Sequence, residues 1–228
     1  MIGPFMLVCL DMAGTTVRDD GAVEAAFTTA LGAIGIADGT PRYDEAQRFV
    51  RDTMGWSKAD VFAELLDPDE AATATAAFAA AYEAIVAAGE VDEMPGALEV
   101  MRSLRCRGVR VCLTTGFAPS TRDALLDALG WRGEVDLALS PADVGRGRPA
   151  PDMILGAMDR LGVDDPGVVA VVGDTVSDLE AGSRAGAGAV IGVLSGAHDE
   201  ATLAAAPHTA ILTDVTGLLA VLESSSPR

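Results

Sequence analysis

Apolar and polar positions divide the chain into three stretches of different character. Leu7 to Leu10 is a continuous aliphatic run that ends at Asp11, which is the pattern of a buried parallel strand. Residues 23–88 show apolar residues at helical spacing and no convincing strand, with glycines between the segments. From residue 94 onward, short aliphatic runs alternate with helical segments. Strands that alternate with helices predict a parallel sheet with right-handed crossovers.

The middle stretch is predicted to be a small helical bundle. Ser57 can cap its third helix. Phe78, Tyr82 and Ile85 lie on one stripe of its fourth helix, and we interpret them as core rather than as a ligand site. The helices expected in this stretch cover residues 23–34, 43–54, 57–66 and 69–88.

The last stretch supplies the rest of the sheet. Its expected strands cover residues 109–113, 135–139, 168–172, 189–193 and 211–212, and its expected helices cover 97–107, 120–129, 152–161, 179–185 and a C-terminal segment. The predicted fold class is therefore α/β, with a Rossmann-like parallel-sheet core formed by residues 1–16 and 93–228. A small all-helical domain of residues 17–92 is inserted after the first strand.

Composition narrows the choice of partners. The 228 residues are half apolar, enough for one large domain or one domain with an insertion. The formal charge of −18 argues against nucleic acid and anionic membranes, which need a basic face, but not against a small anionic substrate. No apolar run approaches the ~20 residues of a membrane span, and no signal peptide is evident, so we expect a cytoplasmic protein. The three cysteines lack metal-ligand spacing, and we expect Cys9 and Cys112 to be buried free thiols.

Polar residues follow the predicted strands at their carboxyl ends. Asp11 follows the first strand, Thr115 and Gly116 follow the second, and Asp174 follows a later one. Because the carboxyl ends of parallel strands share one edge of a sheet, these groups can meet there. Asp11 alone could equally cap the next helix. With these partners it becomes a candidate nucleophile, a carboxylate able to form an acyl phosphate.

The other strand-end residues suit phosphoryl chemistry. Asp174 offers a hard oxygen ligand for Mg²⁺, which needs few carboxylates and keeps bound waters. Thr115 and the Gly116 amide can bind phosphate oxygens. Arg148, in the loop before a later helix, supplies a fork-shaped cation that matches phosphate. The sequence therefore predicts a site for phosphoryl transfer.

Four short motifs, in this order and spacing, resemble those of the haloacid dehalogenase superfamily. They are Asp11-Met12-Ala13-Gly14-Thr15, Thr114-Thr115-Gly116, Arg148-Pro149-Ala150-Pro151 and Gly173-Asp174-Thr175-Val176-Ser177-Asp178. The resemblance covers the whole chain and implies that residues 17–92 form the helical cap of this superfamily. It also implies a common site, with Mg²⁺ held by Asp11, the Ala13 carbonyl and Asp174, and with Gly14, Thr15 and Asp178 as supporting residues.

One position departs from most phosphatases of the superfamily. They carry a second aspartate two residues after the nucleophile, where it protonates the departing alkoxide. This chain has Ala13 there, and a methyl group donates no proton. Two branches need no proton from that position: haloacid dehalogenases expel a halide, and phosphonoacetaldehyde hydrolases (phosphonatases) expel a carbon stabilised as an enamine. Dehalogenases bind no metal and have little use for Asp174.

The chain looks like the phosphonatase branch. That branch combines Asp-x-Ala-Gly-Thr in the first motif with arginine in the third, and its cap lysine lies in a Met-Gly-x-x-Lys run, matched here by residues 54–58. The resemblance implies that Lys58 condenses with an aldehyde to give an iminium ion, an electron sink beside the carbon–phosphorus bond, while Asp11 takes the phosphoryl group. Val61 and Phe117 depart from the branch, which has a histidine and a tyrosine at these positions.

Lys58 is the sole lysine among 16 basic residues. A solvated surface residue is the ordinary interpretation of a lysine, but the arginines used elsewhere in this chain cannot form a Schiff base. A covalent role would require a pKa lowered by burial, because the free amine is the nucleophile. His198 and His208 lie far along the chain and are expected to be surface or structural residues. Arg122 is a candidate for an added phosphate contact.

The leading hypothesis is a Mg²⁺-dependent hydrolase that cleaves the carbon–phosphorus bond of phosphonoacetaldehyde or a related phosphono-aldehyde. The alternatives are a phosphomonoester phosphatase in which water replaces the missing acid, a non-catalytic protein that binds a phosphate ligand, and a dehalogenase. The expected partner is thus a small phosphonate or phosphate, with no nucleic acid and no membrane. The resemblance also allows a homodimer formed through the helical cap.

Overall fold

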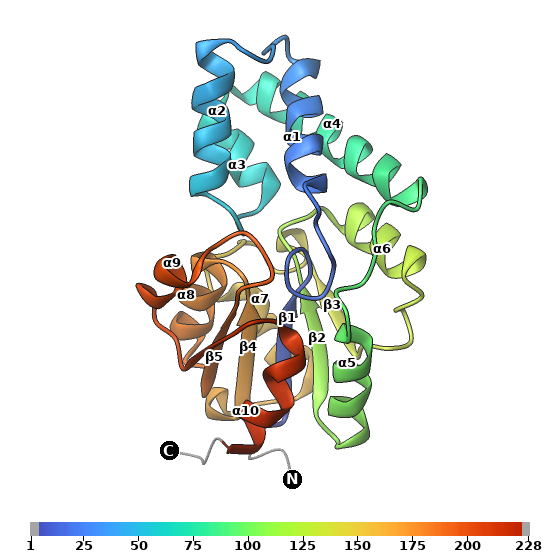
Figure 1. Ribbon diagram of the computed structural model, residues 1–228, viewed down its shortest axis with the longest axis vertical. Coiled ribbons are helices and arrows are strands. Elements are labelled where there is room, and N and C mark those ends of the chain that lie inside the picture. The colour runs from blue at the N-terminus through green and yellow to red at the C-terminus, as the bar shows by residue number, and fades with distance from the viewer. Residues whose placement is uncertain (1–4, 225–228) are drawn as a thin grey trace.

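A six-stranded parallel sheet forms the centre of the molecule, which is described by a computed structural model for residues 5–224 (Figure 1). The strands follow the order β3-β2-β1-β4-β5-β6, so β1 lies between its two closest partners in the middle of the sheet. The predicted α/β class is confirmed. The strands are β1 Leu7–Asp11, β2 Arg110–Thr114, β3 Leu137–Leu139, β4 Val169–Gly173, β5 Ala189–Val193 and β6 Ala210–Leu212.

Helices cover both faces of this sheet. The central strand alternates: Val8 and Leu10 belong to one core cluster with helices α5, α6 and α10, while Leu7 and Cys9 belong to a second cluster with helices α7 and α8. A strand buried on both faces is aliphatic throughout, as this one is. The helices are α5 Ala97–Cys106, α6 Pro119–Ala128, α7 Asp152–Leu161, α8 Val176–Ala185, α9 Glu200–Ala204 and α10 Leu218–Ser224.

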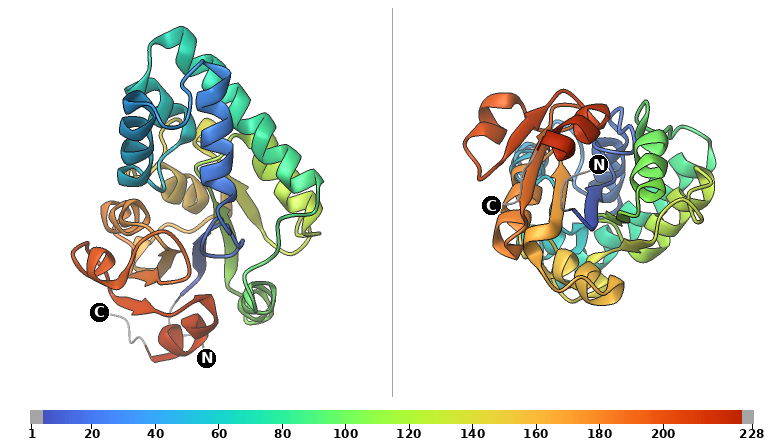
Figure 2. Two further views of the ribbon diagram at one scale, coloured as in Figure 1. Left: turned by 45° about the horizontal axis from the view of Figure 1, so that its top comes forward. Right: turned by 90° about the horizontal axis from the view of Figure 1, so that it is seen from below.

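Four helices between β1 and α5 form a group beyond the carboxyl edge of the sheet (Figures 1 and 2). The inward faces of these helices carry an aromatic cluster in which the ring centroids of Phe27 and Phe78 lie 4.7 Å apart. Tyr82 is buried in this cluster 4.5 Å from Phe117 of the sheet domain, so the stripe that we interpreted as core is core. These helices are α1 Ala22–Ala33, α2 Pro41–Asp52, α3 Lys58–Leu65 and α4 Pro68–Ala87.

Some local expectations are wrong. Ser57 stands at the N-cap of α3, but its hydroxyl makes no capping hydrogen bond. Helix α8 begins three residues earlier than expected because Thr175 and Asp178 form a capping box around its polar first turn. Helix α9, which the sequence pattern did not predict, buries little beyond Leu203 and so leaves no apolar periodicity.

The core domain and the inserted helical domain are predicted to meet at residues 16/17 and 92/93. Those limits stay a prediction, and residues 1–4 and 225–228 of the predicted core lie outside the described part of the chain. No helix between residues 5 and 224 is both long enough and apolar enough to cross a membrane. Cys9 and Cys112 are buried free thiols, as expected, and Cys106 is exposed.

Candidate active site

The loop after β1 presents Asp11 to a cavity. The backbone N–H groups of Thr15, Thr16 and Val17 all donate to the carbonyl oxygen of Met12, which folds the loop tightly back on the strand end. Gly14 sits in this loop with a φ of 84°, a conformation that side chains rarely adopt. A Cβ atom at this position would lie 2.5 Å from a carboxylate oxygen of Asp174, so the first and fourth motifs meet through a glycine.

Arg148 joins two buried carboxylates. Its Nη1 donates to Asp11 Oδ1 at 2.5 Å and also to Asp178. Asp178 is held in turn by the Thr175 backbone N–H and hydroxyl, at the start of α8. The Nε of Arg148 is buried and has no hydrogen-bond partner among residues 5–224. One donor of this guanidinium is therefore left for a ligand oxygen.

Three carboxylates form a cluster suited to a divalent cation. One oxygen from each of Asp11, Asp174 and Asp178 lies within 4.8 Å of the others, and all three side chains are buried. Burial raises the pKa of Asp11 to about 7, and burial also raises the pKa of Asp174 well above its usual value. Nearby carboxylates oppose ionisation in both cases, so a cation here would relieve their repulsion. The Arg148 Nη1 binds Asp11 as well as Asp178, and Thr175 adds two hydrogen bonds to Asp178, so Asp178 is the more fully hydrogen-bonded of these two carboxylates.

The loop after β2 ties the helical cap to the sheet domain. The Thr115 hydroxyl accepts a hydrogen bond from the Phe117 N–H at 3.2 Å. The Gly116 carbonyl accepts one from the Lys58 N–H at 3.0 Å. A Cβ atom at Gly116 would overlap the carbonyl oxygen of Trp56. The second motif is thus in direct contact with the segment that begins α3, and its glycine makes that contact possible.

We predict that Gly116→Ala will misplace Lys58. The added methyl must push the backbone of Trp56 away, and overpacking of this kind costs about 1–3 kcal/mol of stability. Displacement by about 1 Å in a site can lower the rate about 10²-fold. Gly133→Ala is the matched control, because its Cβ would meet no atom within 4 Å. Steady-state kinetics and urea unfolding of both variants would measure the effect, and equal behaviour of the two would contradict it.

Lys58 is buried at the first turn of α3, with 8% of its surface exposed. Its Nζ lies 5.4 Å from the ring centroid of Phe27 and 5.7 Å from that of Phe117. No carboxylate oxygen in the described part of the chain comes within 4.0 Å of Nζ. Burial lowers the pKa of this amine to about 8, and the positive charge of Arg148 acts in the same direction. The carboxylates that partly oppose this shift are Asp11, Asp19 and Asp174.

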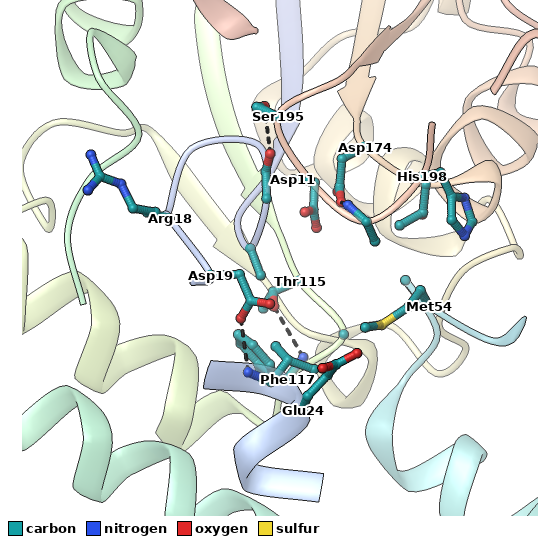
Figure 3. Close-up of a pocket in the computed structure, with 18 of the residues that line it drawn as sticks. Asp11, Arg18, Asp19, Glu24, Met54, Thr115, Phe117, Asp174, Ser195 and His198 are labelled. Carbon is teal, nitrogen blue, oxygen red and sulfur yellow. Dashed lines mark hydrogen bonds between the residues drawn. The ribbon is translucent and has the colours of Figure 1, made fainter. Parts of the chain in front are cut away.

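These groups line a cavity of about 460 Å³ that lies between the sheet and the helical cap (Figure 3). Thr15 and Asp178 lie behind its wall, where the Thr15 hydroxyl donates to Asp174 at 3.4 Å. Met54 also contributes to the wall. The predicted site residues that line the cavity are Asp11, Ala13, Gly14, Lys58, Thr115, Gly116, Arg148 and Asp174.

The loop after β5 contributes groups that the sequence did not reveal. Ser195 donates its hydroxyl to the Gly14 carbonyl at 2.7 Å, and the Ala197 N–H donates to Asp174 at 2.7 Å (Figure 3). His198, expected to be a surface or structural residue, lines the cavity, and its Nδ1 accepts a hydrogen bond from the Val176 N–H. The strand-end rule that singled out Asp174 would have found this loop if applied to β5.

Arg122 does not line the cavity, contrary to its predicted role as a phosphate contact. Its guanidinium pairs instead with Asp143 at 2.5 Å and with Asp123 at 2.7 Å. Asp19, which the sequence placed in a polar turn, is found instead among the cavity residues.

Comparison with known proteins gives the family. A family model described as haloacid dehalogenase-like hydrolase matches residues 5–186. The chain belongs to this family of hydrolases. The hydrolase is 33% identical to "Probable phosphatase IndB" of Dickeya dadantii (strain 3937), over 97% of each chain. It is 30% identical to a phosphonoacetaldehyde hydrolase of Latilactobacillus sakei subsp. sakei (strain 23K), over 78% of this chain and 72% of that protein.

A solved structure shares the fold of this hydrolase. A hydrolase from Pseudomonas syringae superposes with a TM-score of 0.84 at 24% identity, over 97% of this chain and 99% of that one. At this identity the likeness shows the fold alone. The relatives named above divide between phosphatase and phosphonoacetaldehyde hydrolase, so they agree with the family but differ in the activity that their names give.

Proposed function

We propose that this hydrolase cleaves the carbon–phosphorus bond of a phosphono-aldehyde, phosphonoacetaldehyde or a relative, with Asp11 as nucleophile and Lys58 as the amine that forms a Schiff base. The observation that carries the proposal is the burial of the sole lysine in the cavity that holds Asp11, without an ion-pair partner in the described chain. An unpaired buried amine opposes folding, and its lowered pKa makes it a nucleophile near neutral pH. The relatives named phosphonoacetaldehyde hydrolase support the same reaction.

The chemistry accounts for Ala13. Condensation of the Lys58 amine with the aldehyde, with uptake of one proton, gives an iminium ion and water. The iminium accepts the electron pair of the carbon–phosphorus bond while Asp11 bonds to phosphorus, and an enamine leaves. No alkoxide forms, so no acid is needed at position 13. Water then hydrolyses the aspartyl phosphate and, after protonation of the enamine carbon, releases the product aldehyde from Lys58.

The remaining groups would bind the phosphoryl end of the substrate. We assign its oxygens to Thr115, the Gly116 N–H and Arg148, whose Nε has no hydrogen-bond partner in the described part of the chain. The oxygen donors Asp11 and Asp174, with the Ala13 carbonyl, suit Mg²⁺, and Gly14, Thr15 and Asp178 keep them in place. Mg²⁺ at this position supplies charge stabilisation for the transferred group.

Borohydride trapping tests the proposal. Incubation with phosphonoacetaldehyde, reduction and peptide mass analysis are expected to find an adduct on Lys58. The reduced product is an N-ethyl group where cleavage preceded reduction and an N-phosphonoethyl group where it did not. Because the amine has a pKa of about 8, the rate of adduct formation is expected to rise with pH and to level off above that value. An adduct confined to the α-amino group, with turnover of phosphate esters, would refute carbon–phosphorus cleavage.

A phosphomonoester phosphatase is the second candidate, favoured by the full-length relative named a probable phosphatase. In that case water would protonate the departing alkoxide, since Ala13 cannot. The two candidates differ in their need for Lys58. Ester hydrolysis would survive Lys58→Arg, whereas carbon–phosphorus cleavage would not, because arginine forms no Schiff base.

A further inference from the structure

Schiff-base formation needs a proton carrier, and the residue at the expected position cannot be one. Three residues after Lys58 stands Val61, an apolar side chain that is buried in the core of the cap. The amine must lose protons as it attacks, and the oxygen of the aldehyde must gain two before it leaves as water. Some other group in the cavity must therefore carry these protons. This inference rests on the proposed function.

Three carboxylates act electrostatically on the Lys58 amine and are candidates for this role. The carboxylates whose charge acts on its amine are those of Asp11, Asp19 and Asp174. Asp11 is assigned to phosphorus, and Asp174 accepts hydrogen bonds from Thr15 and from the Ala197 N–H beside the metal cluster. Asp19 is the carboxylate that has no part in binding the phosphoryl group.

Asp19 is also built into the cavity. It lies in the loop between β1 and α1, mostly buried, and lines the same cavity as Lys58 (Figure 3). One of its oxygens accepts the Val23 N–H at 2.9 Å, which fixes the side chain at the start of α1. Its other oxygen has no hydrogen-bond or ion-pair partner within residues 5–224. Within residues 5–224 no carboxylate oxygen comes within 4.0 Å of the Lys58 Nζ, so Asp19 and Lys58 line the same cavity without forming a direct ion pair.

We propose that Asp19 is the acid–base residue that moves protons while Lys58 condenses with the aldehyde. Burial raises the pKa of this carboxyl, which brings its acidic form closer to the working pH. Asp19 lies in the loop that connects β1 to the first helix of the cap, and this position explains how it can share a cavity with Lys58 of the cap. Asp19 takes the place in the reaction that Val61 cannot fill.

The proton transfers balance. The Lys58 ammonium gives one proton to the Asp19 carboxylate, and the free amine forms a C–N bond with the aldehyde carbon as the carbonyl electrons move to oxygen. A second nitrogen proton passes to that oxygen, giving a carbinolamine. The Asp19 carboxylic acid then protonates the hydroxyl, the C–O bond breaks, and the nitrogen lone pair completes the C=N bond. The products are the iminium ion, water and the Asp19 carboxylate.

Asp19→Asn separates this role from a purely structural one. Asparagine keeps an oxygen that can accept the Val23 N–H, but it cannot carry the proton. Asp38→Asn is the matched control, because Asp38 is exposed and does not line the cavity. At saturating phosphonoacetaldehyde, borohydride quenching at successive times should show Lys58 adduct forming about 10²- to 10⁴-fold more slowly in Asp19→Asn, and at the wild-type rate in Asp38→Asn.

The affinity for inorganic phosphate, measured by calorimetry, should be the same in both variants and in wild type, because Asp19 does not touch the phosphoryl site. Adduct formation at the wild-type rate in Asp19→Asn would overturn the proposal and leave the proposed function standing. Slow adduct formation accompanied by an equal loss of phosphate affinity would also overturn it, since the site as a whole would then be disturbed. Absence of any Lys58 adduct in wild type would instead refute the proposed function.

Discussion

Asp11→Asn is expected to stop phosphate release while leaving the Schiff base intact. Asparagine has nearly the same shape and keeps an oxygen for the Arg148 Nη1, but it does not form an acyl phosphate. Loss of a nucleophile of this kind lowers turnover by at least about 10⁴-fold. Lys58 belongs to the cap and reacts with the other end of the substrate, so its condensation with the aldehyde does not need Asp11.

The products of borohydride reduction make this prediction specific. Wild type should give N-ethyl-lysine at position 58, whereas Asp11→Asn should accumulate N-phosphonoethyl-lysine and release no phosphate. Asp159→Asn is a suitable control, because Asp159 is an exposed carboxylate on α7. Phosphate release by Asp11→Asn at more than about 1% of the wild-type rate would show that another group attacks phosphorus.

The sheet, and the site residues at the carboxyl ends of its strands, can be predicted from the sequence for a physical reason. A strand buried on both faces must be continuously apolar, so its end is marked by the first polar residue, as at Asp11 and at Thr114, which precedes Thr115. Parallel pairing then brings those residues to the same edge, and Asp11 is in register with Thr114 of the neighbouring strand. Arg148 follows no strand directly, so the sequence predicted its phosphate-binding chemistry but not its ion pair with Asp11.

The burial of cap residues could not be predicted in the same way. Lys58 is buried because the start of α3 packs on Gly116, more than fifty residues away along the chain, and no local pattern encodes that contact. Asp19 stands in a polar turn beside Asp20 and Gly21, a pattern that predicts a solvent-exposed loop. It becomes a cavity residue only because the cap covers it. Contacts between the cap and the sheet decide the site, and they are long-range.

Lys58→Met is expected to abolish carbon–phosphorus cleavage and to stabilise the fold. Methionine has a similar length and no amine, so the iminium cannot form, and the loss should be at least about 10⁴-fold. The stability effect has the opposite sign. Because burial lowers the pKa of Lys58 from 10.5 to about 8, the folded state binds this proton less tightly than the unfolded state does. Removing the amine should relieve up to about 3 kcal/mol.

The pH dependence identifies the source of that stability. The unfavourable contribution of Lys58 to stability is fully present below pH 8, where the folded and unfolded states both carry the proton. It decreases as the pH rises from 8 to 10.5, the range in which the folded state has released the proton and the unfolded state has not. Urea unfolding should therefore show the advantage of Lys58→Met at pH 7 and a smaller one at pH 10. Lys58→Arg, which keeps the charge, should be equally inactive on phosphono-aldehydes but should gain no stability. An amine that lowers the stability of the fold is explained if the reaction needs it. A Lys58→Met variant that is less stable than wild type and still cleaves the carbon–phosphorus bond would instead mean that Lys58 serves packing rather than chemistry.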